Sequence, residues 1–361
     1  MNPYWHNLFT GLQEADGAAP GALRALAAGL AALYGLGART RRELYARGIF
    51  PVRRLPAPVV SVGNLTVGGT GKTPVTACLA RRLQEASRRV AILSRGYGCQ
   101  RRGVTRLSDG QRLLARPPAV GEEAYWLART LPGAAVYTGA ARFEAGMAAW
   151  REFQPDLFLL DDGFQHFQLH RDLDIVLLDA ASPFGNGRLL PRGPLREPVA
   201  ALAAAQVLIL TRFQAGAHDG ALADLKSAFP EKTILTADIA PVTARRYPGG
   251  ETRPPEALKG RALSAFAGLA RPQVFARTLA ELEVRLTGFR AFPDHQAFSR
   301  QDLQELVREA GAQQAEALIT TGKDWARLGG EWQADLPLWV LEVEARIPQV
   351  HRLLELLDRK I

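Results

Sequence analysis

Short, wholly apolar runs recur along the first two thirds of the chain, and helical patterns and glycine-containing turns separate them. Short runs without polar alternation are typical of strands that helices cover on both faces. Such runs predict strands at residues 59–62, 90–93, 157–160, 175–178 and 207–210. Apolar spacing typical of helices predicts helices at 74–86 and 121–131. This alternation favours a parallel α/β sheet.

Beyond about residue 240 the composition changes, and the Pro/Gly-rich segment 247–255 (YPGGETRPP) predicts a linker. A second α/β pattern follows, in which Ser299 and Asp302 form a capping box ahead of a helix that ends at Gly311. Its further elements are expected at 262–266, 273–282, 284–289, 317–320 and 338–343. We therefore predict two α/β domains, residues 1–240 and a smaller one at 241–361 with a C-terminal helix, and a cleft between them.

An apolar stretch at residues 21–38 contains Arg24 and leads into a group of basic residues. No uncharged apolar run reaches the 18 or more residues that a conventional spanning helix needs. The stretch fits either an interfacial helix on an anionic membrane or an ordinary helix packed on its domain.

Composition excludes several classes of protein. The chain has 361 residues, of which 47% are hydrophobic and 22% charged, which is too apolar for a disordered protein. Its two cysteines, Cys78 and Cys99, are too few for a disulfide framework or a four-thiolate zinc site and fit a reducing compartment. The net charge of +9 is compatible with polyanionic partners: nucleic acid, anionic lipid or phosphorylated substrates.

Residues 61–74 read SVGNLTVGGTGKTP, directly after a predicted strand and before a predicted helix. Glycines in such a loop let backbone N–H groups face phosphate oxygens, while Lys72 reaches the β- and γ-phosphates and the Thr73 hydroxyl ligates Mg²⁺. The strict pattern would place glycine at position 66, so Thr66 makes the loop a variant. The residues expected at the nucleotide are Asn64, Thr66, Gly68, Gly69, Thr70, Gly71, Lys72, Thr73 and Pro74.

The strand predicted at 157–160 runs directly into Asp161 and Asp162. P-loop proteins present a carboxylate to the magnesium shell at the end of such a strand, and a cation favours two adjacent aspartates. Helix capping by Asp162 is the alternative. His166 and His170 stand four residues apart, but HFQLH lacks the glutamate of a zinc protease helix.

Together these motifs resemble the tetraacyldisaccharide 4′-kinase family, the lipid A 4′-kinases. Besides the loop, the matching segments are SRGYG (94–98), LLDDGFQHFQLHRDLDIVLLDA (159–180), GRLLPRGPLREP (187–198), FAGLARPQVF (266–275), FPDH (292–295) and TTGKD (320–324). The resemblance implies transfer of the ATP γ-phosphate, with Mg²⁺, to the 4′-hydroxyl of a lipid disaccharide 1-phosphate, giving lipid IVA. It also implies a P-loop NTPase-like domain hinged to a smaller one.

The resemblance further implies a peripheral protein on the cytoplasmic face of the bacterial inner membrane, held by an N-terminal amphipathic helix within about residues 1–48. An anionic membrane surface and the lipid substrate are then the expected partners, with no nucleic acid and a monomeric chain. Both partners are anionic, which suits the basic surface.

The resemblance also implies roles for single residues. Arg196 would stabilise charge on the transferring phosphoryl group, the alternative being an ion pair with Glu197. Glu122 stands where the family has an aspartate as general base, which pairs with the histidine at His295. The longer side chain moves the carboxylate by about 1.5 Å. Three alternatives are therefore open: glutamate acts as the base here, another carboxylate does, or activity is reduced. Tyr97, Gln165 and His166 are expected around the substrate or nucleotide. Gly322 of TTGKD stands where the family often has glutamate, which leaves the role of that loop open.

Other classes have weaker support. A P-loop GTPase would need an N/T-K-x-D motif, but Lys323 and Asp324 are adjacent in TTGKDW. A nucleic-acid-binding ATPase rests only on charge and predicts steep salt dependence of DNA binding. A soluble small-molecule kinase would not need the N-terminal amphipathic segment.

Overall fold

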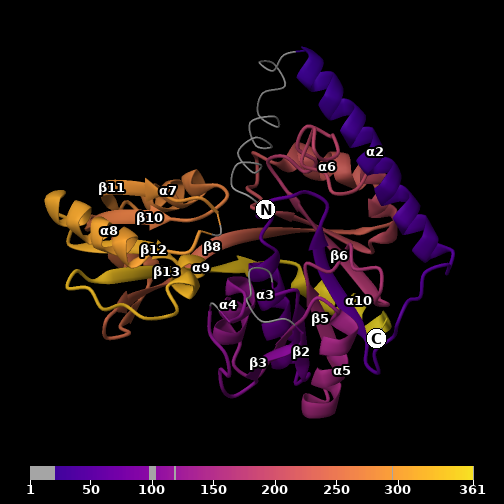
Figure 1. Cartoon of the computed structure of the whole chain (residues 1–361), viewed down its shortest axis with the longest axis horizontal. Coiled ribbons are helices and arrows are strands. Elements are labelled where there is room, and N and C mark those ends of the chain that lie inside the picture. The colour runs from indigo at the N-terminus through magenta and orange to yellow at the C-terminus, as the bar shows by residue number, and fades with distance from the viewer. Residues whose placement is uncertain (1–20, 97–102, 118, 295, 361) are drawn as a thin grey trace. The chain divides into compact units, whose positions relative to one another are not determined.

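A computed structural model describes residues 21–96, 103–117, 119–294 and 296–360 (Figure 1). Tyr97, Cys99 and His295 lie outside the described residues. By its internal contacts the chain forms two compact units. Unit 1 takes the described parts of 1–72, 155–238 and 347–361, and unit 2 those of 73–154 and 239–346.

Unit 1 is built on a parallel sheet whose strands pair in the order β8–β7–β6–β1–β5. The strands are β1 (Val59–Asn64), β5 (Leu157–Asp161), β6 (Leu173–Asp179), β7 (Val207–Thr211) and β8 (Thr233–Tyr247). Every residue of β1, β5, β6 and β7 is buried, as expected for strands covered on both faces. The helices are α2 (Gly21–Ala46), η1 (Val199–Ala204), α6 (Asp219–Ala228) and α10 (Val350–Lys360).

Unit 2 contains two sets of paired strands. In the first set, β2 (Val90–Ser94) pairs with β4 (Ala135–Thr138) in parallel, and β3 (Thr105–Asp109) adds an antiparallel edge. In the second set, β11 (Arg285–Ala291), β10 (Ala262–Ala267), β12 (Ala317–Thr321) and β13 (Leu338–Arg346) pair in this order, all in parallel. A short antiparallel strand, β9 (Thr252–Arg253), pairs with the end of β8.

The helices of unit 2 follow the sequence pattern closely. Ser299 caps α8 through the predicted box, since its Oγ accepts from the Asp302 N–H and the Asp302 carboxylate accepts from the Ser299 N–H. The helical elements are α3 (Lys72–Glu85), which begins at the unit boundary, α4 (Glu122–Thr130), α5 (Arg142–Phe153), η2 (Pro255–Leu258), α7 (Pro272–Glu281), α8 (Arg300–Ala312) and α9 (Gly322–Arg327).

The α/β class and the parallel strands predicted from the apolar runs are confirmed. The prediction of a linker at 247–255 is wrong, because this segment forms the turn of the β8–β9 hairpin inside unit 2. Its proline and glycine residues serve a reversal within one unit, and the chain passes from unit 1 to unit 2 inside β8, at residues 238 and 239. The division into domains 1–240 and 241–361 stays a prediction. Among the described helices, none is both long and apolar enough to cross a membrane.

Gly63 in β1 packs directly against the turn that follows β5. A Cβ at this position would lie 2.5 Å from the Phe164 Cβ and 2.7 Å from the Phe164 backbone nitrogen. Phe164 is fully buried in the core of unit 1 and cannot give way. We therefore expect Gly63→Ala to lower the free energy of unfolding by about 1–3 kcal/mol, measured by urea denaturation. Gly220→Ala in α6 is the control, since a Cβ there meets nothing within 4 Å; equal stability of the two variants would contradict the prediction.

Candidate active site

The glycine-rich loop joins the end of β1 to the start of α3. Gly68 and Gly71 adopt φ values of +102° and +81°, in the left-handed region that favours glycine. The Asn64 side-chain amide donates to the Thr66 carbonyl at 2.8 Å and closes the first turn of the loop. Lys72 then opens α3, with Thr73 and Pro74 in its first turn, where the helix N-terminus favours an anion.

Two residues at the end of β7 hold the loop by its carbonyl groups. The Thr211 hydroxyl donates to the Thr70 carbonyl at 2.9 Å, and Arg212 Nη1 donates to the Gly69 carbonyl at 3.0 Å. Arg212 is itself fixed by the Asp179 carboxylate at 2.5 Å. The sequence analysis did not identify Thr211 and Arg212 as site residues. They could have been found from their position directly after the strand predicted at 207–210.

Lys72 and Arg196 meet at the Asp162 carboxylate. Lys72 Nζ lies 3.5 Å from Asp162 Oδ1, and Arg196 Nη1 donates to both carboxylate oxygens at 3.1 Å. Asp161 is buried as the last residue of β5, and Asp162 follows with φ +55° in the left-handed region. The turn after β5 thus brings Asp162 to the predicted lysine and arginine, with Asp161 directly before it in the chain. We call Lys72, Asp161, Asp162 and Arg196 the phosphate-loop cluster.

Arg196 reaches this cluster because its own segment pairs with the loop. The Arg196 backbone N–H donates to the Leu65 carbonyl at 2.7 Å, and the Val67 N–H donates to the Pro194 carbonyl at 2.8 Å. The alternative of an Arg196–Glu197 ion pair is wrong, because Glu197 pairs with Arg42 of α2 while Arg196 pairs with Asp162. Burial raises the pKa of Glu197, and the Arg42 charge acts in the opposite direction.

Gln165 and His166 form part of the tight turn after Asp162. The Gln165 side-chain amide donates to the Asn64 carbonyl at 2.9 Å, and the His166 N–H donates to the Gly163 carbonyl at 2.9 Å. Gln165 therefore joins this turn to the end of β1 at the loop. The predicted contacts of these two side chains with substrate stay predictions.

Three buried polar atoms along β1 and the loop have no hydrogen-bond partner among the described residues: Ser61 Oγ, Asn64 Oδ1 and Thr70 Oγ1. An unpaired buried polar atom is costly unless a ligand or water satisfies it. Two of them lie in the loop that the sequence assigns to phosphate, beside the converging lysine, arginine and aspartates. The residues present therefore fit a nucleotide phosphate chain with a divalent cation.

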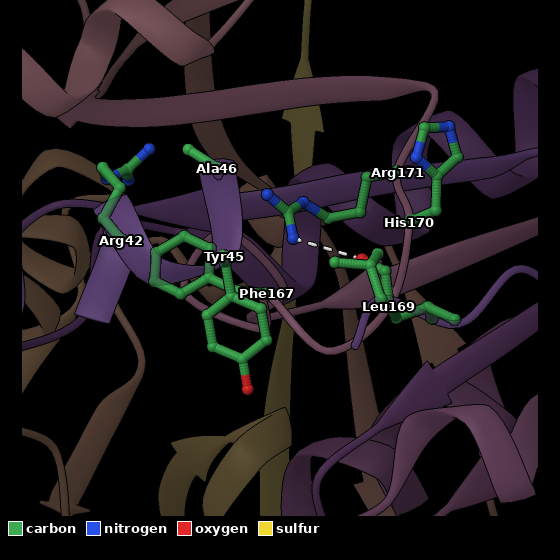
Figure 2. A pocket seen from close by; sticks show the side chains of 8 residues that line it. Arg42, Tyr45, Ala46, Phe167, Leu169, His170 and Arg171 are labelled. Atoms are coloured by element: carbon green, nitrogen blue, oxygen red, sulfur yellow. Dashed lines mark hydrogen bonds between the residues drawn. The ribbon is translucent and has the colours of Figure 1, made fainter. Parts of the chain in front are cut away.

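A pocket of about 220 Å³ is lined by residues from the end of α2 and from the segment 167–171 (Figure 2). The guanidinium carbons of Arg42 and Arg171 lie 4.9 and 5.7 Å from the ring centre of Phe167. Both arginines are already paired, Arg42 with Glu197 and Arg171 with Asp174 at 2.7 Å. The pocket is lined by Arg42, Tyr45, Ala46, Val52, Phe167, Leu169, His170 and Arg171.

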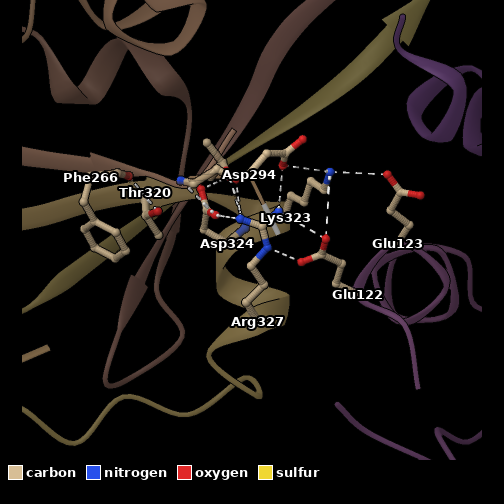
Figure 3. A network of polar contacts seen from close by, with 10 residues as sticks. Glu122, Glu123, Phe266, Asp294, Thr320, Lys323, Asp324 and Arg327 are labelled. Atoms are coloured by element: carbon tan, nitrogen blue, oxygen red, sulfur yellow. Dashed lines mark hydrogen bonds and ion pairs between the residues drawn. The ribbon is translucent and has the colours of Figure 1, made fainter. Parts of the chain in front are cut away.

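Glu122 lies at the start of α4 in unit 2, in a second cluster of charges (Figure 3). Its carboxylate accepts from Arg327 Nε and, at 3.1 Å, from Arg327 Nη2. Lys323 Nζ lies 3.3 Å from Glu123 Oε1 and 3.9 Å from Glu122 Oε1. Asp294, the neighbour of His295 in FPDH, accepts from Arg327 Nη2 at 3.2 Å. We call Glu122, Glu123, Asp294, Lys323, Asp324 and Arg327 the carboxylate cluster.

The carboxylates of the cluster favour the charged forms of its two cations, of which Arg327 is 4% and Lys323 27% exposed. Burial would lower the pKa of Lys323, but the charges of Glu123, Asp294 and Glu122 outweigh it and raise that pKa. Burial would likewise lower the pKa of Arg327, and the hydrogen bond and charge of Glu122 raise it. Burial raises the pKa of Asp324 despite the neighbouring Arg327 charge.

Gly322 in TTGKD has a packing reason. A Cβ at this position would overlap the Glu342 carboxylate and lie 2.8 Å from Trp126 Nε1. The Glu342 carboxylate there accepts from Trp126 Nε1 at 3.2 Å and pairs with Arg129. The glycine therefore leaves room for a glutamate that comes from β13.

Comparisons with known proteins agree on one family. A family model described as tetraacyldisaccharide-1-P 4′-kinase matches residues 23–361. A tetraacyldisaccharide 4′-kinase from Geobacter sulfurreducens is 42% identical over 344 residues, covering 95% of this chain and 94% of the relative. One from Anaeromyxobacter sp. (strain Fw109-5) is 44% identical, covering 91% and 90%. A crystal structure of LpxK from Aquifex aeolicus in complex with ATP superposes with a TM-score of 0.75 and 31% identity, covering 93% of this chain and 99% of that one.

Proposed function

The chain belongs to the tetraacyldisaccharide-1-P 4′-kinase family, and we propose that its phosphate-loop cluster transfers the γ-phosphate of ATP to the 4′-hydroxyl of a tetraacyldisaccharide 1-phosphate, giving lipid IVA. As a member of this family it is a kinase of lipid A biosynthesis. The observation that carries the assignment of the site is the convergence of Lys72 and Arg196 on Asp162 beside the glycine-rich loop.

The residues of the glycine-rich loop and of the phosphate-loop cluster divide the work of phosphoryl transfer, which consists mostly of positioning and charge neutralisation. Lys72 contacts the β- and γ-phosphates, and Arg196 stabilises charge on the transferring group. Thr73, Asp161 and Asp162 hold Mg²⁺, which when bound neutralises part of the phosphate charge. The pairing of Asp162 with Lys72 and Arg196 supports this. The two cations can exchange the carboxylate for phosphate oxygens, and the carboxylate can exchange the two cations for Mg²⁺, so each keeps a partner whose charge has the same sign.

Glu122 is the residue that we assign to accept the proton of the 4′-hydroxyl, with His295 as its partner. The position in the VGEE segment and the adjacency of Asp294 to His295 support this assignment. The 4′-hydroxyl oxygen bonds to the γ-phosphorus while the bond from that phosphorus to the β,γ-bridging oxygen breaks and ADP leaves. The proton of the hydroxyl passes to the carboxylate of Glu122. In this function the chain acts as a monomer and binds no nucleic acid.

The test of this function is transfer of labelled γ-phosphate from ATP to a tetraacyl disaccharide 1-phosphate in mixed micelles. We expect a labelled lipid bisphosphate that depends on both lipid and Mg²⁺, and competition by unlabelled ATP that GTP does not match. A folded protein that binds ATP but labels no lipid would overturn the substrate assignment. Equal competition by GTP would instead favour a GTPase.

We further infer that α2 lies on the surface of an anionic membrane, on the cytoplasmic face. Ala27 and Ala31 are buried, and Gly35 approaches Leu189 so closely that a Cβ there would lie 2.6 Å from its Cδ1. The large residues of the helix point outward instead: the exposed fractions of Leu26, Leu30, Leu33 and Leu36 are 61%, 47%, 68% and 64%. This is the reverse of an ordinary amphipathic helix, whose large apolar residues face the core.

Basic residues at the end of the same helix suit an anionic surface, since each can contribute about 1 kcal/mol of attraction near such lipids. They are Arg39 and Arg41. Arg42 already pairs with Glu197, and Arg47 follows the end of the helix and pairs with Glu43. Burial of the leucines would add the apolar part of the binding free energy.

Charge in place of the outward leucines is expected to release the protein from membranes. Because burial of one leucine contributes about 1.5–3 kcal/mol, Leu30→Glu with Leu33→Glu should weaken binding at least about 100-fold. The measurement is sedimentation with vesicles that contain anionic phospholipid. Leu114→Glu is the matched control, because this leucine is also 50% exposed but lies in unit 2. If the double variant binds as tightly as the parent, α2 is not the anchor.

A further inference from the structure

Arg327 uses every hydrogen-bond donor that its guanidinium has. Nε donates to Glu122; Nη1 donates to the Gly268 carbonyl and, at 2.8 Å, to Asp324 Oδ1; Nη2 donates to Glu122 at 3.1 Å and to Asp294 at 3.2 Å. An arginine has five N–H groups in a planar fork, so this set is complete. Only 4% of the side chain is exposed. These hydrogen bonds and the surrounding packing fix the position of the guanidinium group.

The fork joins segments that are far apart in the sequence. Glu122 begins α4 and lies 205 residues from Arg327, while Asp294 follows β11 and Gly268 follows β10. Figure 3 shows Glu122 and Asp294 approaching α9 from different elements, with Arg327 below Asp324. Arg327 therefore joins the VGEE segment to the FPDH segment by hydrogen bonds, and Lys323 lies between the same segments at longer distances.

Arg327 is in turn held by the start of α9. Asp324 accepts from Arg327 with Oδ1 and from the Thr321 hydroxyl with Oδ2 at 2.8 Å, and the Gly268 N–H donates to its Oδ1 at 3.2 Å. The Thr321 Oγ1 accepts from the Asp324 N–H at 3.1 Å and caps the helix. Asp324 and Thr321 of TTGKD thus form the support for Arg327.

We propose that Arg327 is a positioning residue, which fixes the Glu122 carboxylate by two hydrogen bonds and holds it against Asp294 in the geometry that proton transfer requires. The proposal rests on the base role of Glu122 proposed above and gives the TTGKDWAR segment its function. A bidentate arginine fixes both the plane and the distance of a carboxylate. Reaction geometry matters steeply, since a displacement of about 1 Å can cost about 100-fold in rate.

Charges from three elements also act on the proton affinity of Glu122. The cations Arg327 and Lys323 of α9 lie at its carboxylate. The carboxylates of Asp294, Glu123 and Asp324 pair with these same two cations. The two hydrogen bonds make Arg327 the strongest of these neighbours. Removing its charge therefore moves the titration of Glu122 to higher pH.

Two substitutions separate geometry from charge. Arg327→Lys keeps the positive charge but cannot form the fork. We expect its kcat to fall about 100-fold, with the KM for ATP changed less than about twofold and the acid limb of kcat/KM in place. Arg327→Met loses both, so its kcat falls at least as far and its acid limb moves to higher pH. The assay is the lipid phosphorylation described above, measured across pH on variants whose thermal unfolding is monitored.

Arg129→Met is the matched control. Arg129 is a half-buried arginine of the same helix as Glu122, but its ion-pair partner is Glu342. Loss of packing or stability alone should affect this variant too, but its pH profile should match that of the parent.

The outcomes decide both proposals separately. If the parent is active and Arg327→Lys keeps kcat within about threefold, the positioning role is wrong while the kinase function stands. An unmoved acid limb in folded Arg327→Met would equally overturn it, and if that variant does not fold, Arg327→Lys decides. An inactive parent would refute the function itself, and the positioning role with it.

Discussion

Replacing Lys72 by alanine is expected to lower kcat for γ-phosphate transfer by about 100- to 1,000-fold. Its ammonium is the cation that α3 places at the end of the glycine-rich loop, 3.5 Å from Asp162. Without this ammonium group, the charge that develops on the phosphate in the transition state has no fixed cation beside it. Water stabilises that charge less well than a fixed cation does. The measurement is the initial rate of lipid labelling at saturating ATP, with ATP affinity determined separately by titration.

Arg82→Ala provides the control for Lys72→Ala. Arg82 is also a cation of α3, but it pairs with Glu85 on the exposed face of the helix at 2.8 Å. Such surface pairs contribute about 0–1 kcal/mol, so activity should stay close to that of the parent. If Lys72→Ala kept near-parental kcat and ATP affinity, the loop would not be the phosphate site.

Glu122→Gln is the second substitution with a large expected effect, a fall in kcat of about 100- to 10,000-fold. The amide keeps the size of the side chain but cannot accept the proton of the 4′-hydroxyl. ATP binding should persist, because the phosphate-loop cluster is unchanged. Lipid labelling and ATP titration together measure this difference, and His295→Ala belongs beside it as the expected partner.

Glu122→Asp adds a sharper version of the same experiment. The carboxylate is retained but withdrawn by about 1.5 Å, so it can no longer meet the Arg327 fork in the same place. We expect activity above that of Glu122→Gln and below that of the parent. Full activity in Glu122→Gln would leave the kinase function intact and exclude Glu122 as the base.

Much of the fold could be predicted because most of the buried parallel strands are visible in the sequence as short runs of consecutive apolar residues. Strands β3 and β8 were missed for the opposite reason: their residues alternate irregularly between buried and partly exposed positions. Strand β4 was missed although it is buried, because its four residues, AVYT, do not form a wholly apolar run. The segment 247–255 misled because proline and glycine mark a chain reversal as readily as a linker. Local composition does not say which unit contains the turn.

The phosphate loop could be found because its chemistry lies within consecutive residues. The role of Arg327 could not, because its ion pair with Glu122 joins positions 205 residues apart. Arg196 and Glu197 show the converse: neighbours in sequence, they pair with different residues, Asp162 and Arg42. Ion pairs depend on which elements the fold brings together, and spacing along the chain carries no record of that.

The interleaving of the two units has a consequence for synthesis on the ribosome. Unit 1 contains residues 347–361, so its core lacks α10 until the rest of the described chain has been made. Leu353 and Leu357 of that helix are buried, so α10 takes part in the packing of the finished protein. Residues 73–154 likewise wait for 239–346 to complete unit 2. Each unit therefore stays incomplete until the ribosome has also made a segment of the other unit.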